Sequence, residues 1–229
     1  MSHKISTINT IEVSALCDNK CSYCPAPVQH EHRPVGLMTL ETFKKAVFWV
    51  QYFAEHGTQQ ELNLHGVGEP TLNKDLVEMI RLARAAAPSI TINFNTNGNN
   101  LTPELARACK DAGITSINIT AHDAVATKNA AKALRAAGVQ GHVNADFAVN
   151  PNNWGGQVQW TDTVDYKLWC HWLDKGQVMV MWDGRVTRCC LDAFGQGTFA
   201  TIEDHLPNLE VTPFVLCENC HHERPTEAI

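Results

Sequence analysis

The stretch Cys17-Asp18-Asn19-Lys20-Cys21-Ser22-Tyr23-Cys24-Pro25 carries three cysteines just after a predicted strand. Thiolates are soft ligands that favour zinc, copper(I) and iron–sulfur clusters. A four-iron cluster usually takes four cysteines, so three on one loop would leave one iron open to another ligand. The alternative is a zinc site, for which His30 or His32 would supply the fourth ligand.

The composition restricts the kinds of protein that this chain can be. Its 229 residues are 44% apolar, which predicts a packed globular fold. A net charge of −6 without a block of Lys or Arg argues against nucleic acid as a partner. No apolar run is long enough to span a membrane, and no secretory signal is visible. Nine cysteines without such a signal indicate metal binding in a reducing compartment, and therefore a cytoplasmic protein.

The first 150 residues alternate between strand-like and helix-like patterns. Short runs of branched apolar residues predict strands, and apolar residues at helical spacing predict helices. Thr102 followed by Pro103 is a strong helix start, because a capping residue precedes a proline at the first helical position. The predicted strands cover residues 8–16, 61–65, 90–94, 114–120 and 139–149, and the predicted helices cover residues 39–56, 73–87, 102–113 and 124–137.

This alternation predicts an α/β fold with a parallel sheet built from βαβ units. We expect residues 1–150 to form a partial (β/α) barrel of five or six parallel strands, since eight strands do not fit in this length. Chemistry in such folds lies at the carboxyl ends of the strands. The three cysteines follow the first strand and are therefore expected at this rim.

The C-x3-C-x2-C spacing, with Tyr23 just before the third cysteine, resembles the radical S-adenosylmethionine (radical SAM) enzymes. In that family the open iron of a 4Fe-4S cluster binds S-adenosylmethionine, and electron transfer then releases a 5′-deoxyadenosyl radical. The resemblance implies that Cys17, Cys21 and Cys24 hold this cluster and that Tyr23 lies beside the cofactor. It also implies an electron donor such as flavodoxin or ferredoxin.

A second motif, His65-Gly66-Val67-Gly68-Glu69-Pro70, follows the second predicted strand. Two glycines let the backbone approach a ligand closely, although a plain turn would look the same. The motif looks like the family's G-G-E-P sequence, with Val67 in place of the second glycine. The resemblance implies that Gly66, Val67, Gly68 and Glu69 contact the methionine part of the cofactor.

Three further segments at the predicted rim supply cofactor candidates. The run Asn95-Thr96-Asn97-Gly98 looks like the family's T-N-G segment, although Asn and Gly also form ordinary turns. Thr120-Ala121-His122-Asp123 resembles the family's S-x-D segment, with His122 in the place of the acid. His122 would bind cofactor or substrate, or move a proton; the alternative is a loop histidine without a role. The candidates are Thr96, Asn97, Thr120, His122 and, more weakly, Asn144 in the fifth strand.

Residues 151–229 are predicted to form a linker and a small metal-binding domain. An Asp183-Gly184 turn between two alternating runs predicts a hairpin. Around it lie Cys170, Cys189 and the pair Cys217 and Cys220. This arrangement is similar to the twitch appendage of radical SAM enzymes, a relative of the SPASM type, which holds one auxiliary 4Fe-4S cluster. Zinc would suit the same thiolates, and C-x-x-C-H at 217–221 also matches a haem pattern, which normally requires export.

Two cysteines remain after these assignments. Cys109 lies within a helix and is expected to be a buried small hydrophobe. Cys190 would be structural, an alternative ligand to Cys189, or a thiol that donates a hydrogen atom, as in some radical peptide epimerases.

The sequence as a whole favours oxidation of a substrate C–H bond, with the auxiliary cluster as electron acceptor. The substrate would be a small molecule or a peptide. The alternatives are peptide epimerisation or cross-linking with Cys190 as hydrogen donor, and a binding module that is stabilised by zinc and is not an enzyme.

Overall fold

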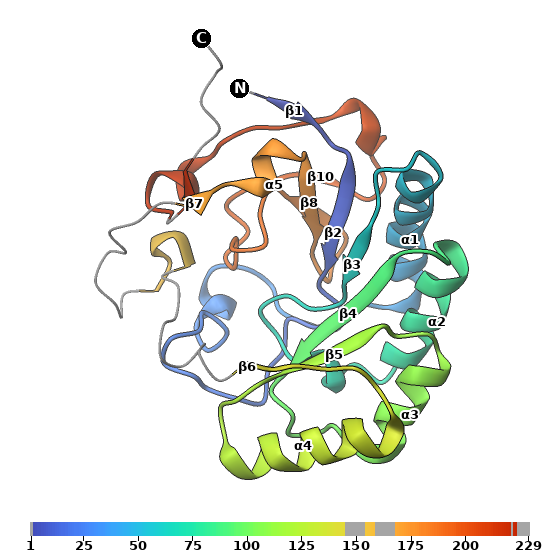
Figure 1. The fold of residues 1–229 in the computed structure, drawn as a ribbon. Helices are drawn as coiled ribbons and strands as arrows, with labels where there is room; N and C mark the ends of the chain where they lie inside the picture. The colour runs from blue at the N-terminus through green and yellow to red at the C-terminus, as the bar shows by residue number, and fades with distance from the viewer. Residues whose placement is uncertain (1, 145–153, 159–167, 221, 224–229) are drawn as a thin grey trace.

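The structure is a computed structural model. It describes residues 2–144, 154–158, 168–220 and 222–223 (Figure 1). Its centre is an eight-stranded sheet. The strands of this sheet are β2 (Thr7–Ile11), β3 (Glu61–Asn63), β4 (Thr91–Thr96), β5 (Ser116–Thr120), β6 (Val143–Asn144), β8 (Gln177–Val180), β9 (Arg185–Thr187) and β10 (Thr198–Thr201). They lie in the order β10-β9-β8-β2-β3-β4-β5-β6.

All pairings from β8 through β2 to β6 are parallel, whereas β9 and β10 extend the sheet by antiparallel pairing. The connections in the first half are α1 (Leu40–Glu55), α2 (Leu76–Ala86), α3 (Pro103–Asp111) and α4 (Ala124–Ala137). Figure 1 shows these helices together along the right and lower side of the strands. The predicted α/β class with a mostly parallel sheet is confirmed.

Shorter elements complete the described chain. Two small sheets pair β1 (His3–Lys4) with β11 (Glu210–Val211) and β7 (Leu168–Trp169) with β12 (His222–Glu223). The C-terminal part contains a short helix, α5 (His171–Asp174). The 3-10 helices are η1 (Gln29–Glu31), η2 (Pro70–Leu72), η4 (Trp154–Gly156), η5 (Leu206–Asn208) and η6 (Val215–Glu218).

Side-chain caps fix the starts of α1 and α3. Thr39 accepts a hydrogen bond from Thr42 N, and Thr102 accepts one from Leu105 N. The predicted helix start at Asn73 was wrong by three positions, since α2 begins at Leu76. The amide of Asn73 is buried and donates to Val13 O at 2.7 Å, so this residue joins the loop to the sheet instead.

Two predicted strands are shorter in the structure. The first ends at Ile11 rather than at residue 16, and Ser14 forms only an isolated bridge to Leu37 as the chain turns into the cysteine loop. Of the fifth, Val143 and Asn144 are extended, while residues 145–149 lie outside the described part. Cys109 is fully buried, as predicted.

The predicted hairpin is present and joins the main sheet. Gly184 has φ +88° in the turn between β8 and β9, a conformation that favours glycine. β8 pairs with β2 in parallel, with Ile11 opposite Val180. The main sheet therefore contains strands from both sides of residue 150, and a domain boundary at this residue stays a prediction. In the part of the chain that the structure describes, no helix is long and apolar enough to cross a membrane.

Candidate active site

A cavity of about 290 Å³ opens where the parallel strands end, and we call it the first cavity. Its walls come from the ends of β4, β5 and β6 and from the segments that follow β2, β3, β4 and β5. All residues predicted for the cofactor site line it: Cys17, Cys21, Tyr23, Cys24, Gly66, Val67, Gly68, Glu69, Thr96, Asn97, Thr120, His122 and Asn144. Cys190, from the C-terminal part of the chain, lines it as well.

The cysteine loop is attached to the loop after β4. Asp18 accepts hydrogen bonds from the side-chain amides of Asn97 at 2.6 Å and Asn100 at 3.0 Å. The Asn97 amide also lies 4.0 Å from Cys17 Sγ. These contacts hold the first cysteine at the cavity wall.

Two thiols of this loop have raised pKa values because they are buried. Burial raises the pKa of Cys24 to about 12 and also raises the pKa of Cys17. Thiols of this kind lose the proton when a metal binds, because the ligand form is the thiolate. His30 and His32 do not line the cavity; His32 stacks on Phe194 instead, with ring centroids 3.9 Å apart. The histidine-completed zinc site is therefore not formed.

The glycine motif packs directly on the start of the cysteine loop. A Cβ at Gly68 would lie 2.4 Å from Ser14 O, so only glycine fits this approach. Glu69 N donates to Leu16 O at 2.7 Å. The motif and the cysteine loop thus share backbone contacts.

The Glu69 carboxylate connects two segments of the rim. Oε1 accepts from Thr71 N at 3.0 Å, from Thr71 Oγ1 at 2.7 Å and from Thr96 Oγ1 at 2.8 Å, while Oε2 accepts from Asn97 N at 2.7 Å. Burial raises the pKa of Glu69 in spite of these donors. Its first role is to fix the loops after β3 and β4 relative to each other.

His122 lies against the cysteine loop. Its Nδ1 hydrogen-bonds to Tyr23 Oη and lies 3.7 Å from Cys21 Sγ. Burial lowers the pKa of His122. His122 also lines a shallow surface hollow that includes Lys128 and Arg135 of α4. His122 thus contacts the cysteine loop, and a role in binding or proton transfer stays a prediction.

A second cavity of about 340 Å³ brings together the four cysteines predicted for an auxiliary cluster. Cys170, Cys189, Cys217 and Cys220 line it, and Cys190 and Leu191 line both cavities. Burial raises the pKa of Cys170. Among the described residues, no three His, Cys, Asp or Glu side chains converge closely enough to hold a single metal ion.

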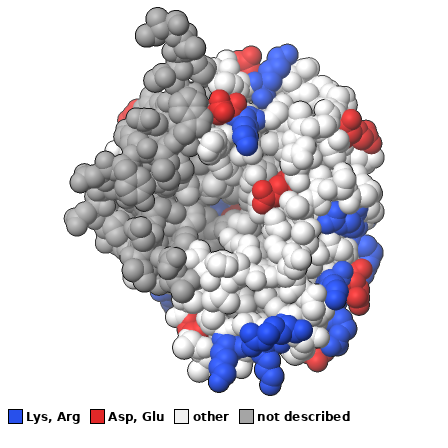
Figure 2. All heavy atoms as spheres, in the orientation of Figure 1, with Lys and Arg blue, Asp and Glu red and all other residues white. Residues whose placement is uncertain are grey.

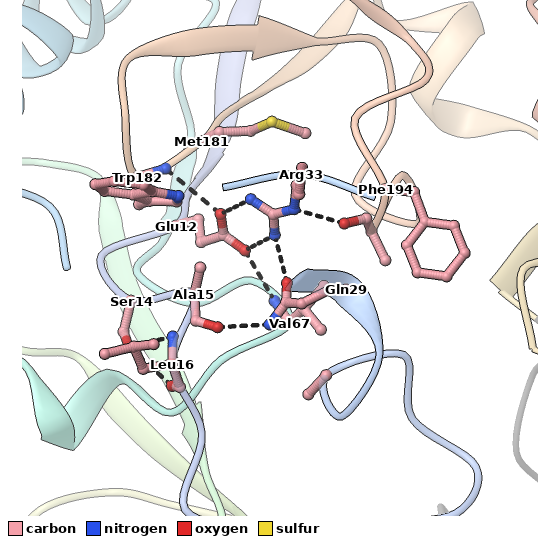
Figure 3. Close-up of polar contacts among 12 residues, drawn as sticks. Glu12, Ser14, Ala15, Leu16, Gln29, Arg33, Val67, Met181, Trp182 and Phe194 are labelled. Carbon is pink, nitrogen blue, oxygen red and sulfur yellow. Dashed lines mark hydrogen bonds and ion pairs between the residues drawn. The ribbon is translucent and has the colours of Figure 1, made fainter. Parts of the chain in front are cut away.

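A buried ion pair between Arg33 and Glu12 was not predicted from the sequence (Figure 3). Arg33 binds the Glu12 carboxylate through two N–O contacts of 2.7 Å, with 1% and 0% of the side chains exposed. Arg33 Nε donates to Ala193 O at 2.6 Å, and Val67 N donates to Glu12 Oε1 at 3.3 Å. The pair joins the cysteine loop, the glycine motif and the segment after Cys190. Its signal in the sequence was Glu12, the only charged residue of the predicted strand 8–16.

His65 is a cavity residue that the sequence analysis quoted but did not assign. It precedes the glycine motif and accepts a hydrogen bond from Asn95 N at 3.4 Å. Burial lowers the pKa of His65 to about 4, so the ring is neutral at pH 7. Its place at a strand end, beside a glycine-rich turn, was the available signal.

The three C-terminal tryptophans whose side chains the structure describes lie in three different surroundings. Trp154 lines the first cavity and donates to Tyr23 O at 3.2 Å, while Trp172 lines the second cavity. Trp182 donates to Pro34 O at 3.1 Å, beside the buried ion pair. Trp160 and the side chain of Trp169 lie outside the described part.

Comparison with known proteins gives partial matches in sequence and a broader match in fold. The PqqA peptide cyclase of Methylocella silvestris is 31% identical over 116 residues, and a GTP 3',8-cyclase of Pasteurella multocida is 35% identical over 112 residues. These alignments cover 50% and 48% of this chain, but 29% and 31% of the relatives, so the chain spans less than a third of their length.

Among solved structures, BtrN in complex with AdoMet and 2-DOIA has a TM-score of 0.71 at 20% identity, over 90% of this chain and 81% of BtrN. An open conformation of BtrN has a TM-score of 0.61 at 19% identity, over 90% and 79%. The family model of the Radical SAM superfamily matches residues 11–145, which include the three cysteines and the rim motifs. The chain therefore belongs to the radical SAM superfamily of enzymes, which implies a 4Fe-4S cluster and S-adenosylmethionine.

Proposed function

We propose that this chain is a radical SAM oxidoreductase that removes hydrogen from a C–H bond of a small molecule or peptide. The observation that carries the proposal is the wall shared by the two cavities, which Cys190 and Leu191 line from both sides. A substrate in the first cavity would lie beside the second set of cysteines. A 4Fe-4S cluster on Cys17, Cys21 and Cys24 would supply reductive cleavage of S-adenosylmethionine and so the radical that abstracts hydrogen.

The residues of the first cavity suit the charged end of the cofactor. Glu69 Oε2 accepts a hydrogen bond from Asn97 N at 2.7 Å, and a carboxylate oxygen can accept a further donor such as an ammonium. Gly66 and Val67 also line the cavity, so their backbone groups would be available to the cofactor. Tyr23 and His122 would contact the cofactor or substrate on the opposite wall. BtrN holds AdoMet within a similar fold, which supports this use of the cavity.

We propose a second, auxiliary 4Fe-4S cluster in a twitch-like domain of residues 151–229, held by Cys170, Cys189, Cys217 and Cys220. Zinc requires four sulfurs at about 2.3 Å from one ion. The four cysteines line one cavity of about 340 Å³, which has room for a cluster. Such a cluster would supply an acceptor for the electron that oxidation releases. In this proposal the parallel strands of residues 1–150 form the partial barrel.

The electron for cofactor cleavage would come from an acidic carrier such as flavodoxin or ferredoxin in the cytoplasm. α3 and α4 and their connection carry five basic and three acidic residues, in a chain whose net charge is −6. Lys128, Lys132 and Arg135 of α4 are exposed, and Figure 2 shows basic side chains gathered along this lower edge. His122 connects this surface to the first cavity. Charge complementarity therefore favours α4 as the docking face.

Peptide epimerisation or cross-linking is the second candidate. Two observations favour it: Cys190 lines the first cavity, and one relative in sequence is a peptide cyclase. The two candidates differ in product mass. Oxidation removes two hydrogens, whereas epimerisation retains the mass in ordinary water and adds one solvent deuterium in heavy water.

The experiment is anaerobic incubation of the reconstituted protein with a reductant, S-adenosylmethionine and candidate substrates. We expect about eight irons per chain, 5′-deoxyadenosine, and a product lighter by two hydrogens. A protein with no more than four irons plus stoichiometric zinc would refute the second cluster. A product of unchanged mass that carries one solvent deuterium would refute oxidation in favour of epimerisation, and Cys190→Ala should then stop that reaction.

A further inference from the structure

Arg188 lies at the wall of the second cavity, directly after β9 and directly before Cys189. Its Nη1 donates to Gly197 O at 2.7 Å, and its guanidinium lies over the Phe199 ring at 4.4 Å from the centroid. Nε is buried and has no hydrogen-bond partner in the part of the chain that the structure describes. A buried donor of a charged group is rarely left in this state, because the group has lost its water.

The nearest negative charges leave this donor available. Asp192 and the thiolate form of Cys217 both lie close enough to Arg188 to interact with its charge. The Asp192 carboxylate is bound elsewhere, however, by Thr187 Oγ1 at 2.5 Å and by Gln196 N and Gly197 N at 2.8 Å each. Arg188 therefore lies at the wall of the cysteine-lined cavity as a cation, and its buried Nε–H has no acceptor among the described residues.

We propose that Arg188 is a positioning and tuning residue for the cluster of the second cavity. Its Nε–H would donate to a sulfur of the group held by Cys170, Cys189, Cys217 and Cys220. A cluster with four thiolates is anionic, and taking up an electron makes it more so. A neighbouring cation and a hydrogen bond to sulfur stabilise the reduced form more than the oxidised form, which raises the reduction potential. Arg188 would thereby make this cluster a better acceptor for the electron of the substrate radical. The inference rests on the proposed function.

The test is an EPR-monitored redox titration of the anaerobically reconstituted enzyme, with Arg188→Gln and Arg188→Lys. At a fixed potential near the midpoint, Arg188→Gln should lower the reduced-to-oxidised ratio of the second cluster at least tenfold, which is about 59 mV for one electron. Arg188→Lys keeps the charge but loses the Nε–H, so its ratio should lie in between. Cys21→Ala lacks one ligand of the first cluster, so the EPR signals that this variant retains are assigned to the second cluster.

The matched control is Arg185→Gln, three residues earlier at the start of β9. Arg185 also has a buried unpartnered nitrogen, but it pairs with Asp183 at 2.8 Å and does not line the second cavity. Its variant should titrate like wild type.

Four outcomes decide the inference. Eight irons with an unchanged ratio in Arg188→Gln would overturn it and leave the proposed function standing. Four irons in the wild-type protein would overturn both. If Arg188→Gln does not bind its second cluster, Arg188→Lys becomes the deciding variant. A reduced-to-oxidised ratio in Arg188→Lys equal to that of the wild type would then overturn the proposed hydrogen bond. An equal fall in Arg185→Gln would show that any charge on the strand has this effect, which also overturns it.

Discussion

Replacing Arg33 with methionine should destabilise the protein by about 3–5 kcal/mol, the usual cost of breaking a buried ion pair by removing one partner. The pair is almost completely buried, since 1% of the Arg33 side chain and 0% of the Glu12 side chain are exposed. The variant removes two 2.7 Å charge-assisted bonds and leaves the Glu12 carboxylate charged and without its cation. It also removes the donor to Ala193 O. Total stabilities are about 5–15 kcal/mol, so the loss would be large.

The matched control has the same distance but not the burial. Lys45 and Glu203 also lie 2.7 Å apart, with 46% and 66% of their side chains exposed. Because solvent screens such a pair, Lys45→Met should leave the unfolding midpoint unchanged. Adding Glu12→Gln to Arg33→Met should recover part of the loss, since glutamine removes the unpaired charge and keeps an acceptor for Val67 N.

The assay is anaerobic urea unfolding of the reconstituted proteins, monitored by circular dichroism. The free energies of unfolding are compared between proteins whose m-values agree. A loss below about 1 kcal/mol in Arg33→Met would refute the reasoning, because that is the range of exposed pairs. So would a lack of recovery in the double variant.

Four further predictions concern the first cavity and its surroundings. Cys21→Ala should abolish 5′-deoxyadenosine formation, because two thiolates would not hold the cluster in place; undiminished cleavage, measured by liquid chromatography, would contradict this. Glu69→Gln should weaken S-adenosylmethionine binding in equilibrium dialysis while both clusters remain, and unchanged affinity would count against a bond to the ammonium. His65 has a pKa of about 4 when folded, against about 6.5 when unfolded, so its contribution to stability is complete above pH 6.5 and is lost as the pH falls toward 4. His65→Asn should therefore weaken the pH dependence of the free energy of unfolding, measured with urea, between about pH 6.5 and pH 4. An unchanged pH dependence would refute the assignment. Lys128→Glu with Lys132→Glu should slow cofactor cleavage about tenfold with flavodoxin but not with dithionite; equal rates with flavodoxin would exclude α4 as the docking face.

The first cavity was largely predictable because its residues sit at regular places. In a parallel sheet the carboxyl ends of all strands meet at one edge, so motifs after successive strands come together wherever the strands themselves are identified. Cys17, Glu69, Asn97 and His122 follow four different strands, and the structure brings them to one cavity. The helix starts at Thr39 and Thr102 were predictable for a local reason, since each depends on a cap and the next three residues.

Features that depend on contacts between distant residues were not predictable. The partner of Glu12 is 21 positions away, and nothing in the local pattern indicates that Arg33 turns inward. The neighbour of β2 on one side is β8, about 170 residues later, and pairing at such a separation leaves no periodic signal. Asn73 looked like a helix start, but a long-range bond to Val13 O decided its conformation.

The pairing of β2 with β8 determines which pieces of this protein can exist alone. A fragment that ends at residue 150 would keep the segment matching the family but lose the strand that covers one side of β2. Its open edge would present unpaired backbone groups, beside Ile8 and Ile11, which are fully buried in the intact chain. Exposed edges of this kind pair with other chains and lead to aggregation. We therefore expect the fragment to be insoluble, so the radical-forming half would depend on the C-terminal half for its own folding.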